Sequence, residues 1–581
     1  EEPPTKRQCI DPATDNNDIQ EINSLREKGQ AAEEKRGIRS YLGNRDDWFS
    51  GIVKLRFEDF LVYEVDLNKN VARITSTEPL DISSFGNADT KNTDPKDVIA
   101  PLIGEEKTEE LLNFVNNTPK NEKTKVSFSL GKFEDKEKRT SIHNSIKLLS
   151  GVRTETKDGE IVVEFTAKKS RTRSRDDWPS DTPPYLNFVL QKTNWDTTKC
   201  ISEFAQRLRV KTSRLSYAGT KDKRAITTQC VSAFKVTPDK LIAVASHMRG
   251  VRVGNFSVEK EPLKLGDLFG NRFSIVLRKV YGKEETIIKN LESVRDIGFI
   301  NYFGMQRFGV GNVPSHHVGK AILQSDWKKV VELILSPKNR SDTKEALEYF
   351  QKTSDIAGTM KKIPRNAIEN KILYGLEKNG KNAYLNAFSM LQRNMRTLYV
   401  HAYQSYVWNR VVSDRVEKYG LEPIEGDLVL VSEQPIENDK DEENEDDLED
   451  IDENDIDSRM KVQVKVLTKE DIDAKTYSIT DVVLPLPGFE VEFPKNALAE
   501  SYKEIMKEDN LDISLKHSMK DYSLTGSYRK IIQKPQNLEW KIQKYNIAEN
   551  PLVLPDADIV AGKTLPEPLT EGIYTAVIVN M

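Results

Sequence analysis

A long polar stretch interrupts the strand-like patterning of this chain, and this interruption limits the folds that it can adopt. Residues 51–64 are dense in aromatic and β-branched residues, which favours strands. Residues from about 71 to 179 are polar, and compact patterning resumes only at Tyr185. We therefore expect the polar stretch to be a separate insert, with a helix near 109–116 and strands near 126 and 161–165.

Elsewhere the periodicity predicts both helices and strands. Asp196 can cap a helix whose apolar residues at 201, 204, 205 and 208 form one buried face. After about residue 313 the pattern turns helical, most clearly over 397–419, where Gly420 can end the helix. Further strands are expected at residues 225–236, 273–280 and 572–579.

Charge is distributed unevenly along the 581 residues. Lys and Arg number 87 and Asp and Glu number 92, which gives a net charge of −5. Residues 437–457 alone hold fourteen acidic residues and one lysine, so the rest of the chain has a net charge of +8. The acidic segment is typical of a solvated, disordered loop, with an RNA-mimicking internal brake as the alternative.

Composition excludes several classes of protein. The length corresponds to about two to four domains, and no run approaches about 18 consecutive apolar residues, so no membrane span is expected. Cys9, Cys200 and Cys230 are too few and too scattered for a disulfide framework or a zinc cluster, which favours a reducing compartment. No glycine-rich segment has the spacing of a nucleotide-binding loop, and the adjacent His316 and His317 are poorly spaced to share a metal.

The densest chemical signal surrounds Asp222. From Gln206 to Arg224 it is the only acidic residue among seven basic ones. Opposite charges favour an ionised carboxyl group, and a basic surface attracts the phosphates of a nucleic acid. Gly219 permits a tight turn before Asp222, and a strand from Ala225 would fix the loop from one side. The pattern favours an ionised nucleophile or base presented to bound nucleic acid; the alternative is that Lys-Asp-Lys is surface decoration.

Aromatic residues alternate with basic ones elsewhere, for example around Phe57 and Phe60 and between Tyr302 and Phe308. Unpaired bases stack on aromatic side chains, at about 1–3 kcal/mol per base. Single-stranded or flipped-out RNA is therefore the expected partner. The alternative is that most of these aromatic residues belong to the core.

Two further basic features lie in the polar insert. Residues 168–175 hold five basic residues, which indicates either a solvated linker or an arm that contacts phosphates. Arg139-Thr-Ser-Ile-His143 has the Arg-x-x-x-His spacing of a small α/β module that binds single-stranded nucleic acid, although a solvent-facing helix without that role fits as well. The residues expected to bind RNA are Lys221, Lys223, Arg224, Arg139, His143, Lys168, Lys169, Arg171, Arg173 and Arg175.

Four segments occur in the order that is found in one known family. They are Gly219-Thr-Lys-Asp222-Lys-Arg-Ala-Ile-Thr-Thr-Gln229, residues 54–64, residues 270–273 and residues 301–309. They resemble the signature and the three other motifs of the TruD family of pseudouridine synthases, with Phe57 in place of a common proline. The resemblance covers roughly residues 48–66, 185–435 and 475–581, with weaker likeness at 404–409, 426–427 and 526–529. The added insert and acidic segment point to the eukaryotic branch.

The resemblance implies an enzyme that isomerises uridine in RNA to pseudouridine. Asp222 matches the family's essential aspartate, which would attack the anomeric carbon or the base, or remove a ribose proton to give a glycal. Lys54 and Phe60 match residues that approach the active cleft, Phe273 matches a pocket aromatic residue, and Asn271 matches a residue that holds the Asp222 loop or the base. Arg307 would support Asp222 electrostatically or serve the structure. No cofactor and no metal are implied.

The resemblance further implies an α+β fold with a mixed, mostly antiparallel sheet and flanking helices. Its expected parts are a tail (1–45), a split catalytic domain (46–70, 180–313 and 521–581), the polar insert (71–179) and an inserted family-specific α/β domain (314–520) with the acidic loop 437–457. Expected substrates are tRNA and, as in eukaryotic members, snRNA and mRNA, which suggests the nucleus and the cytoplasm. Members of the family often work alone, so a monomer is expected. The alternative is a non-catalytic RNA-binding or RNA-folding protein on the same scaffold.

Overall fold

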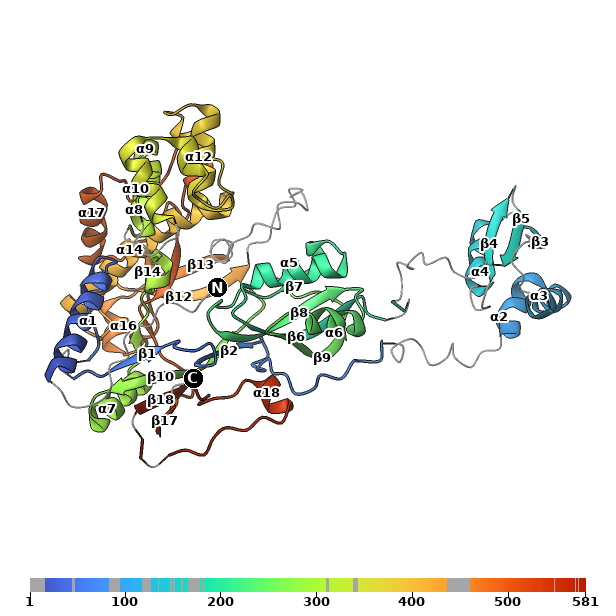
Figure 1. Cartoon of the computed structure of the whole chain (residues 1–581), viewed down its shortest axis with the longest axis horizontal. Coiled ribbons are helices and arrows are strands. Elements are labelled where there is room, and N and C mark those ends of the chain that lie inside the picture. Colours follow the sequence, from blue (N-terminus) through green and yellow to red (C-terminus); the bar gives the residue numbers. More distant parts are fainter. Residues whose placement is uncertain are drawn as a thin grey trace.

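The computed structural model contains a large mixed sheet with helices, a helix-rich unit and a small insert (Figure 1). Their packing follows from strands and helices that each bury one apolar face. The residues that the structure describes are 16–43, 47–82, 95–117, 127–133, 135–146, 149, 152–157, 160–165, 178–179, 182–309, 313–337, 343–435, 460–547, 549–569, 571–572 and 574–581.

The large sheet has nine strands within these residues, in the order β17-β18-β10-β2-β8-β6-β9, with β1 on β10 and β7 on β8. Its described pairs are antiparallel except for β2 and β8, which run parallel. The fold class predicted from the sequence is thereby confirmed. The strands are β1 (Ser50–Val53), β2 (Phe60–Val65), β6 (Tyr185–Thr193), β7 (Leu215–Tyr217), β8 (Ile226–Phe234), β9 (Val251–Glu259), β10 (Gly270–Tyr281), β17 (Glu539–Tyr545) and β18 (Tyr574–Asn580).

The register of the central strands decides which side chains share a face of this sheet. Val62 on β2 lies opposite Phe273 on β10 and opposite Thr227 on β8, and Thr227 lies opposite Lys192 on β6. Directly opposite residues share a face, and alternate residues along each strand join them. The polar and aromatic residues on this face, called the active face below, are Phe60, Glu64, Lys192, Thr227, Gln229, Asn271 and Phe273.

Helix α5 (Thr197–Leu208) covers one part of the active face, and α6 (Pro238–Ser246) packs beside it. Asp196 accepts a hydrogen bond from the Lys199 N–H at 3.1 Å, which confirms the predicted cap. Phe204 of α5 packs on Phe188 of β6. The opposite face is covered near Ile74 and α18 (Asp556–Val560). Helix α5 thus does not cover the part of the active face that β2 and β10 form.

A second unit runs from β11 (Phe299–Ile300) to β16 (Ile532–Gln533) and shares one apolar core. Gly319 of α8 lets that helix approach α14 closely, because a Cβ there would lie 1.9 Å from the Tyr399 carbonyl oxygen. The predicted helix at 397–419 is confirmed as α14, which ends at Gly420 with φ +66°. The helices are α8 (Ser315–Leu323), α9 (Trp327–Ile334), α10 (Lys344–Thr353), α11 (Ile356–Met360), α12 (Ile368–Asn379), α13 (Tyr384–Phe388), α14 (Arg393–Tyr419), α16 (Lys469–Asp473) and α17 (Leu498–Glu508).

The second unit also holds a four-stranded antiparallel sheet in the order β13-β12-β14-β15. Its strands are β12 (Leu428–Pro435), β13 (Met460–Val466), β14 (Val482–Leu486) and β15 (Ser527–Lys530). The catalytic part was predicted to resume at residue 521, yet β15 pairs with β14 and the large sheet resumes only at β17. The acidic segment 437–457 lies outside the described residues.

The insert has a core of its own, in which Leu111, Ile142 and Ile161 are buried. Figure 1 shows it apart from the large sheet. The helix predicted near 109–116 and the strand predicted at 161–165 are both confirmed. Its elements are α2 (Pro95–Ile103), α3 (Glu105–Asn117), β3 (Ser127–Lys132), α4 (Lys136–Ile146), β4 (Val152–Lys157) and β5 (Glu160–Phe165).

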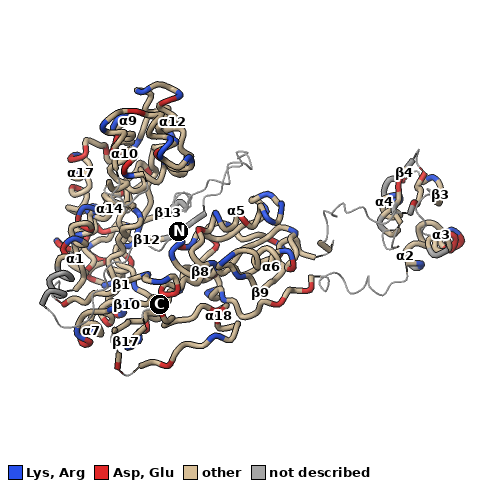
Figure 2. Tube along the Cα trace, in the orientation of Figure 1, with Lys and Arg blue, Asp and Glu red and all other residues tan. Residues whose placement is uncertain are grey.

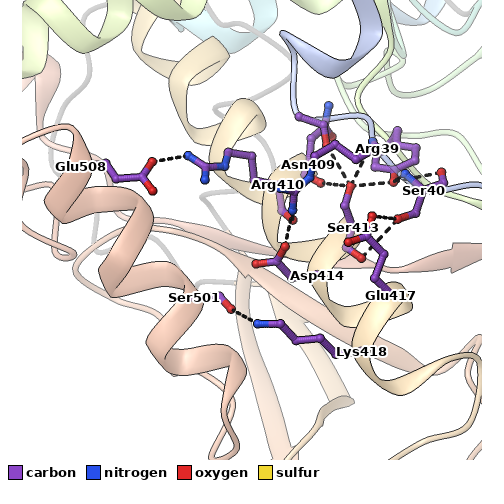
Figure 3. Close-up of polar contacts among 12 residues, drawn as sticks. Arg39, Ser40, Asn409, Arg410, Ser413, Asp414, Glu417, Lys418, Ser501 and Glu508 are labelled. Atoms are coloured by element: carbon purple, nitrogen blue, oxygen red, sulfur yellow. Dashed lines mark hydrogen bonds and ion pairs between the residues drawn. The ribbon is translucent and has the colours of Figure 1, made fainter. Parts of the chain in front are cut away.

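The N-terminal segment is more than the polar tail that its composition suggested. After α1 (Asn16–Glu34), residues 36–40 lie against α14. Gly37 adopts φ +80°, and a Cβ there would lie only 2.9 Å from the Arg410 backbone nitrogen, so both the backbone angle and the close approach require glycine. The Ser413 hydroxyl on α14 donates to the Gly37 carbonyl at 2.9 Å, and the Ser40 hydroxyl donates to Glu417 at 2.6 Å (Figure 3). Polar groups make this contact, so hydrophobic patterning did not predict it.

The same contact includes the motif at 301–309. The Asn409 amide accepts from the Phe303 N–H and donates to the Phe303 carbonyl, both at 3.0 Å, and it donates to the Arg36 carbonyl at 3.1 Å. The Tyr302 hydroxyl and the Ser413 hydroxyl are 2.8 Å apart. We call Arg36–Ser40, Tyr302, Phe303, Asn409 and Ser413 the α14 clamp.

Candidate active site

Asp222 lies in the loop between β7 and β8, and its side chain is 31% exposed. Its carboxylate accepts a hydrogen bond from Lys54 Nζ at 2.7 Å, although the two residues are 168 positions apart. Lys54 adopts a left-handed backbone conformation with φ +55°, which is uncommon for a residue with a side chain. The carboxylate therefore has one cationic partner and still faces solvent.

Two aromatic rings lie beside this ion pair. Lys54 Nζ is 3.8 Å from the centre of the Phe60 ring, and Phe60 meets Phe273 edge to face with 5.8 Å between ring centres. Asn271 is exposed, two residues before Phe273 on the active face. The structure thus brings Lys54, Phe60 and Phe273 together beside Asp222 and places Asn271 on the same face of the sheet.

A buried ion pair supports the turn that carries Lys54. Asp59 and Arg278 are both fully buried, with Asp59 Oδ1 2.8 Å from Arg278 Nε. Asp59 also accepts from the Arg56 N–H at 2.9 Å. Burial raises the pKa of Asp59, while the charge of Arg278 opposes that rise. Since both charges are removed from water, the pair fixes the start of β2.

Three polar side chains form hydrogen bonds with the backbone of the Asp222 loop. Gln229 Nε2 donates to the Gly219 carbonyl at 2.9 Å, and the Thr197 hydroxyl accepts from the Lys221 N–H at 3.0 Å. Lys192 Nζ donates to the carbonyls of Trp195, Lys221 and Asp222 at 2.8, 3.2 and 3.3 Å. Lys192, Thr197 and Gln229 were given no role in the sequence analysis. Strand periodicity alone would have placed Lys192 of β6 and Gln229 of β8 on the same face of the sheet.

Lys221 does not lie on the outer surface where the sequence placed it. Its ammonium is 2.9 Å from Glu64 Oε2, and the two side chains are 4% and 3% exposed. A phosphate could not reach this ammonium without displacing Glu64, so Lys221 anchors the loop and does not form an RNA contact. Lys223 and Arg224 are exposed, and Arg224 Nε donates to the Lys54 carbonyl at 3.2 Å.

Part of the basic run before Asp222 is occupied by internal contacts. Arg207 pairs with Glu203 at 2.6 Å, and Arg214 Nε donates to the Phe234 carbonyl at 3.0 Å. Figure 2 shows basic residues along the chain near the end of α5. The predicted ring of cations around Asp222 is thus replaced by one close partner, Lys54, which comes from a distant part of the sequence.

The remaining predicted site residues lie elsewhere. Arg307 donates to the Ser405 hydroxyl at 3.1 Å and lies over the Phe303 ring at 5.7 Å, which ties it to α14 and supports the structural alternative. In the insert, Arg139 donates to the Phe133 carbonyl at 2.6 Å, and the His143 ring nitrogens lie 2.6 and 2.9 Å from the hydroxyls of Thr154 and Thr156. Lys168, Lys169, Arg171, Arg173 and Arg175 lie outside the described residues.

Neither a metal centre nor a membrane span can be assigned. Among the residues that the structure describes, no three His, Cys, Asp or Glu side chains are grouped to hold a metal ion. No helix in that part of the chain combines the length and apolar character needed to cross a bilayer. The chemistry that the site offers is that of a partly exposed carboxylate beside an ammonium and two aromatic rings.

Two family models match the sequence. The model described as tRNA pseudouridine synthase D (TruD) matches residues 150–554. The model described as PUS7L N-terminal domain matches residues 97–171, which include most of the insert.

Proteins with similar sequences cover nearly all of the chain. The chain is 39% identical over 557 residues to Pseudouridylate synthase 7 homolog of Homo sapiens, an alignment that covers 93% of this chain and 77% of that protein. It is 34% identical over 638 residues to Multisubstrate pseudouridine synthase 7 of Schizosaccharomyces pombe, covering 99% and 93% of the two chains.

A solved structure shares the fold. It is the putative tRNA pseudouridine synthase D (TruD) from Methanosarcina mazei, with a TM-score of 0.53 and 21% sequence identity. The match covers 95% of this chain and 94% of the other.

Proposed function

The chain belongs to the TruD family of pseudouridine synthases, which are isomerases that act on RNA, and from this premise we propose that Asp222 is its catalytic aspartate. The observation that carries the proposal is the partly exposed Asp222 carboxylate, held 2.7 Å from Lys54 Nζ beside Phe60 and Phe273. An adjacent ammonium keeps a carboxylate ionised, which is the state that a nucleophile or base requires.

The reaction moves uracil from a nitrogen link to a carbon link on the same ribose. The target nucleotide must leave its stack before the sugar can be reached, and Phe60 and Phe273 offer rings beside which the base can lie. Asp222 then attacks the anomeric carbon or the base, or removes a ribose proton, and the freed uracil rejoins through its ring carbon. In this proposal Asn271, which lies on the active face, holds the base or the loop.

We propose tRNA as a substrate, with snRNA and mRNA as further candidates. The description of the matching family model, tRNA pseudouridine synthase D, supports the first. The exposed Lys223 and Arg224 next to Asp222 provide charges for the phosphates of any of these RNAs.

The test compares the wild-type protein with Asp222→Asn, which keeps the size of the side chain and removes its charge. Each protein is incubated with unmodified tRNA, snRNA and mRNA transcripts, and pseudouridine is measured after a chemical label adds mass to it. We expect product from the wild type and a rate at least about 1000-fold lower from the variant. Product from Asp222→Asn at the wild-type rate would remove Asp222 from the chemistry.

The same experiment addresses the alternative function. A wild-type protein that binds these transcripts and yields no pseudouridine from any of them would favour the non-catalytic, RNA-binding function.

We also propose that the insert contributes to RNA affinity. Its own core allows its removal without loss of the catalytic sheet, since the core residues of the insert pack on one another. Deletion of residues 95–165, with a short Gly/Ser linker in their place, is expected to weaken RNA binding while the single-turnover rate at saturating RNA persists. An unchanged dissociation constant would eliminate this role.

A further inference from the structure

Lys192 is a buried cation that forms no ion pair with a carboxylate among the residues that the structure describes. The residue is 1% exposed, and its ammonium donates to the carbonyl oxygens of Trp195, Lys221 and Asp222. An ammonium has three donors, so these three acceptors satisfy it completely. Burial of a charge is unfavourable even when hydrogen bonds compensate it. An apolar side chain would fill this position at less cost, so the ammonium calls for an explanation beyond packing.

The position of Lys192 links it to the reaction that we proposed for Asp222. It lies opposite Thr227 on the active face, and two of its three acceptors are the carbonyls of Lys221 and Asp222. The ammonium therefore binds the two successive carbonyls that precede and follow the Asp222 nitrogen in the backbone. No other cation is placed in this way in the described chain around the loop, because Lys221 is paired with Glu64 and Lys54 approaches the Asp222 side chain.

The orientation of these two carbonyls determines where the neighbouring N–H groups point. The described chain has no cis peptide bond, and in a trans peptide the C=O and the following N–H point in opposite directions. With the carbonyls of Lys221 and Asp222 turned to Lys192, the N–H groups of Asp222 and Lys223 must point away from it. Neither N–H donates a hydrogen bond to any described residue. Two successive backbone N–H groups that both point away from the same ammonium can bind negative charge.

Negative charge moves in the same direction along all three possible routes. The carboxylate loses its charge when it bonds to the anomeric carbon, bonds to the base or takes the ribose proton. In the first and third routes the electron pair of the glycosidic bond leaves with uracil, and in the second the pair of the ring double bond moves onto a uracil carbonyl. Uracil therefore becomes the anion each time, next to the Asp222 loop. Fixed donors at such a position stabilise the transition state.

We propose that Lys192 is a positioning residue for the isomerisation: it fixes the Lys221 and Asp222 carbonyls so that the N–H groups of Asp222 and Lys223 face the charge that develops on uracil. This inference rests on Asp222 as the catalytic residue. It assigns a binding role to two backbone N–H groups, which no side-chain motif could indicate. The residue that orients them, Lys192, lies on β6 and not in the loop itself.

The first test measures Lys192→Met, which keeps the length of the side chain and removes its charge. We expect the single-turnover rate to fall about 100-fold, because the donors of the loop lose their fixed orientation. The dissociation constant for RNA should change by less than about 3-fold, since Lys192 has no access to RNA. Leu186→Ala, at the other end of β6 and equally buried, is the control for a loss of stability and should keep the rate of the folded enzyme.

The outcomes of this test separate two failures. If Asp222→Asn is inactive while Lys192→Met keeps a rate within about 3-fold of the wild type, the proposed function stands and the role of Lys192 is wrong. If Asp222→Asn is as active as the wild type, both are wrong. A loss in Lys192→Met that appears in RNA binding rather than in the rate would also overturn the positioning role.

A second test uses the wild-type enzyme and needs no variant to fold. Burial lowers the pKa of Lys192 to about 8 and the charge of Lys221 lowers it further, while the carboxylates of Asp196 and Asp222 oppose this fall. Above that pH Lys192 of the folded enzyme loses one of the three N–H donors that hold the Trp195, Lys221 and Asp222 carbonyls, so the single-turnover rate should fall as pH rises from 7 to 9. In the unfolded chain Lys192 keeps its proton to a higher pH, so this group makes the fold more stable over the same interval.

Between pH 7 and 9 the rate is expected to fall while the contribution of Lys192 to stability rises, so the two effects can be told apart. A fall in rate without a fall in the unfolding midpoint supports the inference, and a rate that falls only together with the midpoint contradicts it. Lys192→Arg, whose guanidinium does not lose its proton in this range, should be active without the decline above pH 8 if it folds. A rate that is flat from pH 7 to 9 in the wild type would overturn the proposal.

Discussion

The Asp222 loop and the α14 clamp are both held by buried polar side chains, yet they differ in what they leave exposed. In the clamp, Asn409 and Ser413 satisfy backbone groups of the N-terminal segment and of the motif at 301–309. Around the Asp222 loop, Lys192 and Gln229 also satisfy backbone carbonyls, and Glu64 pairs with the buried Lys221 side chain. The Asp222 carboxylate remains 31% exposed beside the Lys54 ammonium, whereas the Asp414 carboxylate that pairs with Arg39 of the clamp is 19% exposed.

This difference separates structural motifs from chemical ones. Both regions contain segments that resemble family motifs, so likeness to a motif does not show which residue reacts. Asp59 and Asp427 are also paired carboxylates, with Arg278 and Arg415, and all four side chains are fully buried. A reactive carboxylate must be reachable by substrate. Substitutions in the clamp should therefore lower stability alone, whereas substitutions at Asp222 and its partner should separate activity from stability.

The largest expected effect is on stability, in the scaffold beneath Lys54. Arg278→Met leaves the buried Asp59 carboxylate without its cation, and we expect the free energy of unfolding to fall by about 3–5 kcal/mol. Urea denaturation measures this change. The double variant Asp59→Leu with Arg278→Met should recover part of the loss, because it buries no charge. A single variant that costs less than about 1 kcal/mol would contradict the importance of this pair.

The exposed pair should behave in the opposite way. Lys54→Met removes the ammonium beside Asp222, and we expect the single-turnover rate to fall about 30-fold, which corresponds to about 2 kcal/mol in the barrier. Stability should change by about 0.5 kcal/mol or less, since a partly exposed ion pair adds little to it. Lys54→Arg retains a charge and serves as the control. A loss of stability that matches the loss of rate would make Lys54 a structural residue.

The clamp region offers a pH test of stability alone. His316 of α8 is buried and stacks on Tyr406 of α14 at 4.3 Å, and burial lowers its pKa to about 3. The unfolded chain takes up a proton near pH 6.5, whereas the folded chain does not, so stability is lost as pH falls below that value. At pH 5 we expect this group to cost about 2 kcal/mol relative to pH 7.

The measurement for His316 is the free energy of unfolding of the wild type and of His316→Phe at pH 7 and pH 5. The variant should lose less stability than the wild type between the two values. Equal losses would show that His316 is protonated in the folded protein as readily as in the unfolded one.

The smallest effect concerns two neighbouring lysines that the sequence treats alike. Lys223→Ala removes an exposed cation, so RNA affinity should fall about 3-fold and its salt dependence should weaken by about one ion. Lys221→Met removes a buried cation paired with Glu64, so it should lower stability and leave the salt dependence unchanged. Titrations at several salt concentrations distinguish the two. Equal salt slopes for both variants would mean that Lys221 reaches RNA.

The sequence predicted the fold class, the enzyme class and several elements, because periodicity and local motifs are properties of neighbouring residues. The helix capped by Asp196 and the long helix ending at Gly420 follow from spacing and capping alone. The resemblance implied that Lys54 approaches the active cleft, but its pairing with Asp222 was not predicted, since 168 residues separate them. Lys192 could have been noticed as a charged residue at a core position of a strand, but no partner for it was evident.

The failures share a physical cause. Lys221 was expected at the surface because lysine is seldom buried, yet Glu64 compensates its charge. Residues 36–40 were expected to be a tail because their contacts with α14 are polar. In each case the partner that makes burial possible lies far away in the sequence. Local composition does not contain that information.

The ends of the insert meet at one hydrogen bond, since the Thr182 hydroxyl donates to the Ile82 carbonyl at 3.3 Å across 100 residues of sequence. β2 and β8 run parallel, so the chain leaves β2 at the end of the sheet opposite to the Asp222 loop, and β6 starts at that same end. A change in the length of the segment between Ile82 and Thr182 therefore alters only a loop whose two ends are already held together. The insert can thus be lengthened, replaced or removed with little change in the stability of the large sheet. A protein engineer could attach a new RNA-binding domain at the same place.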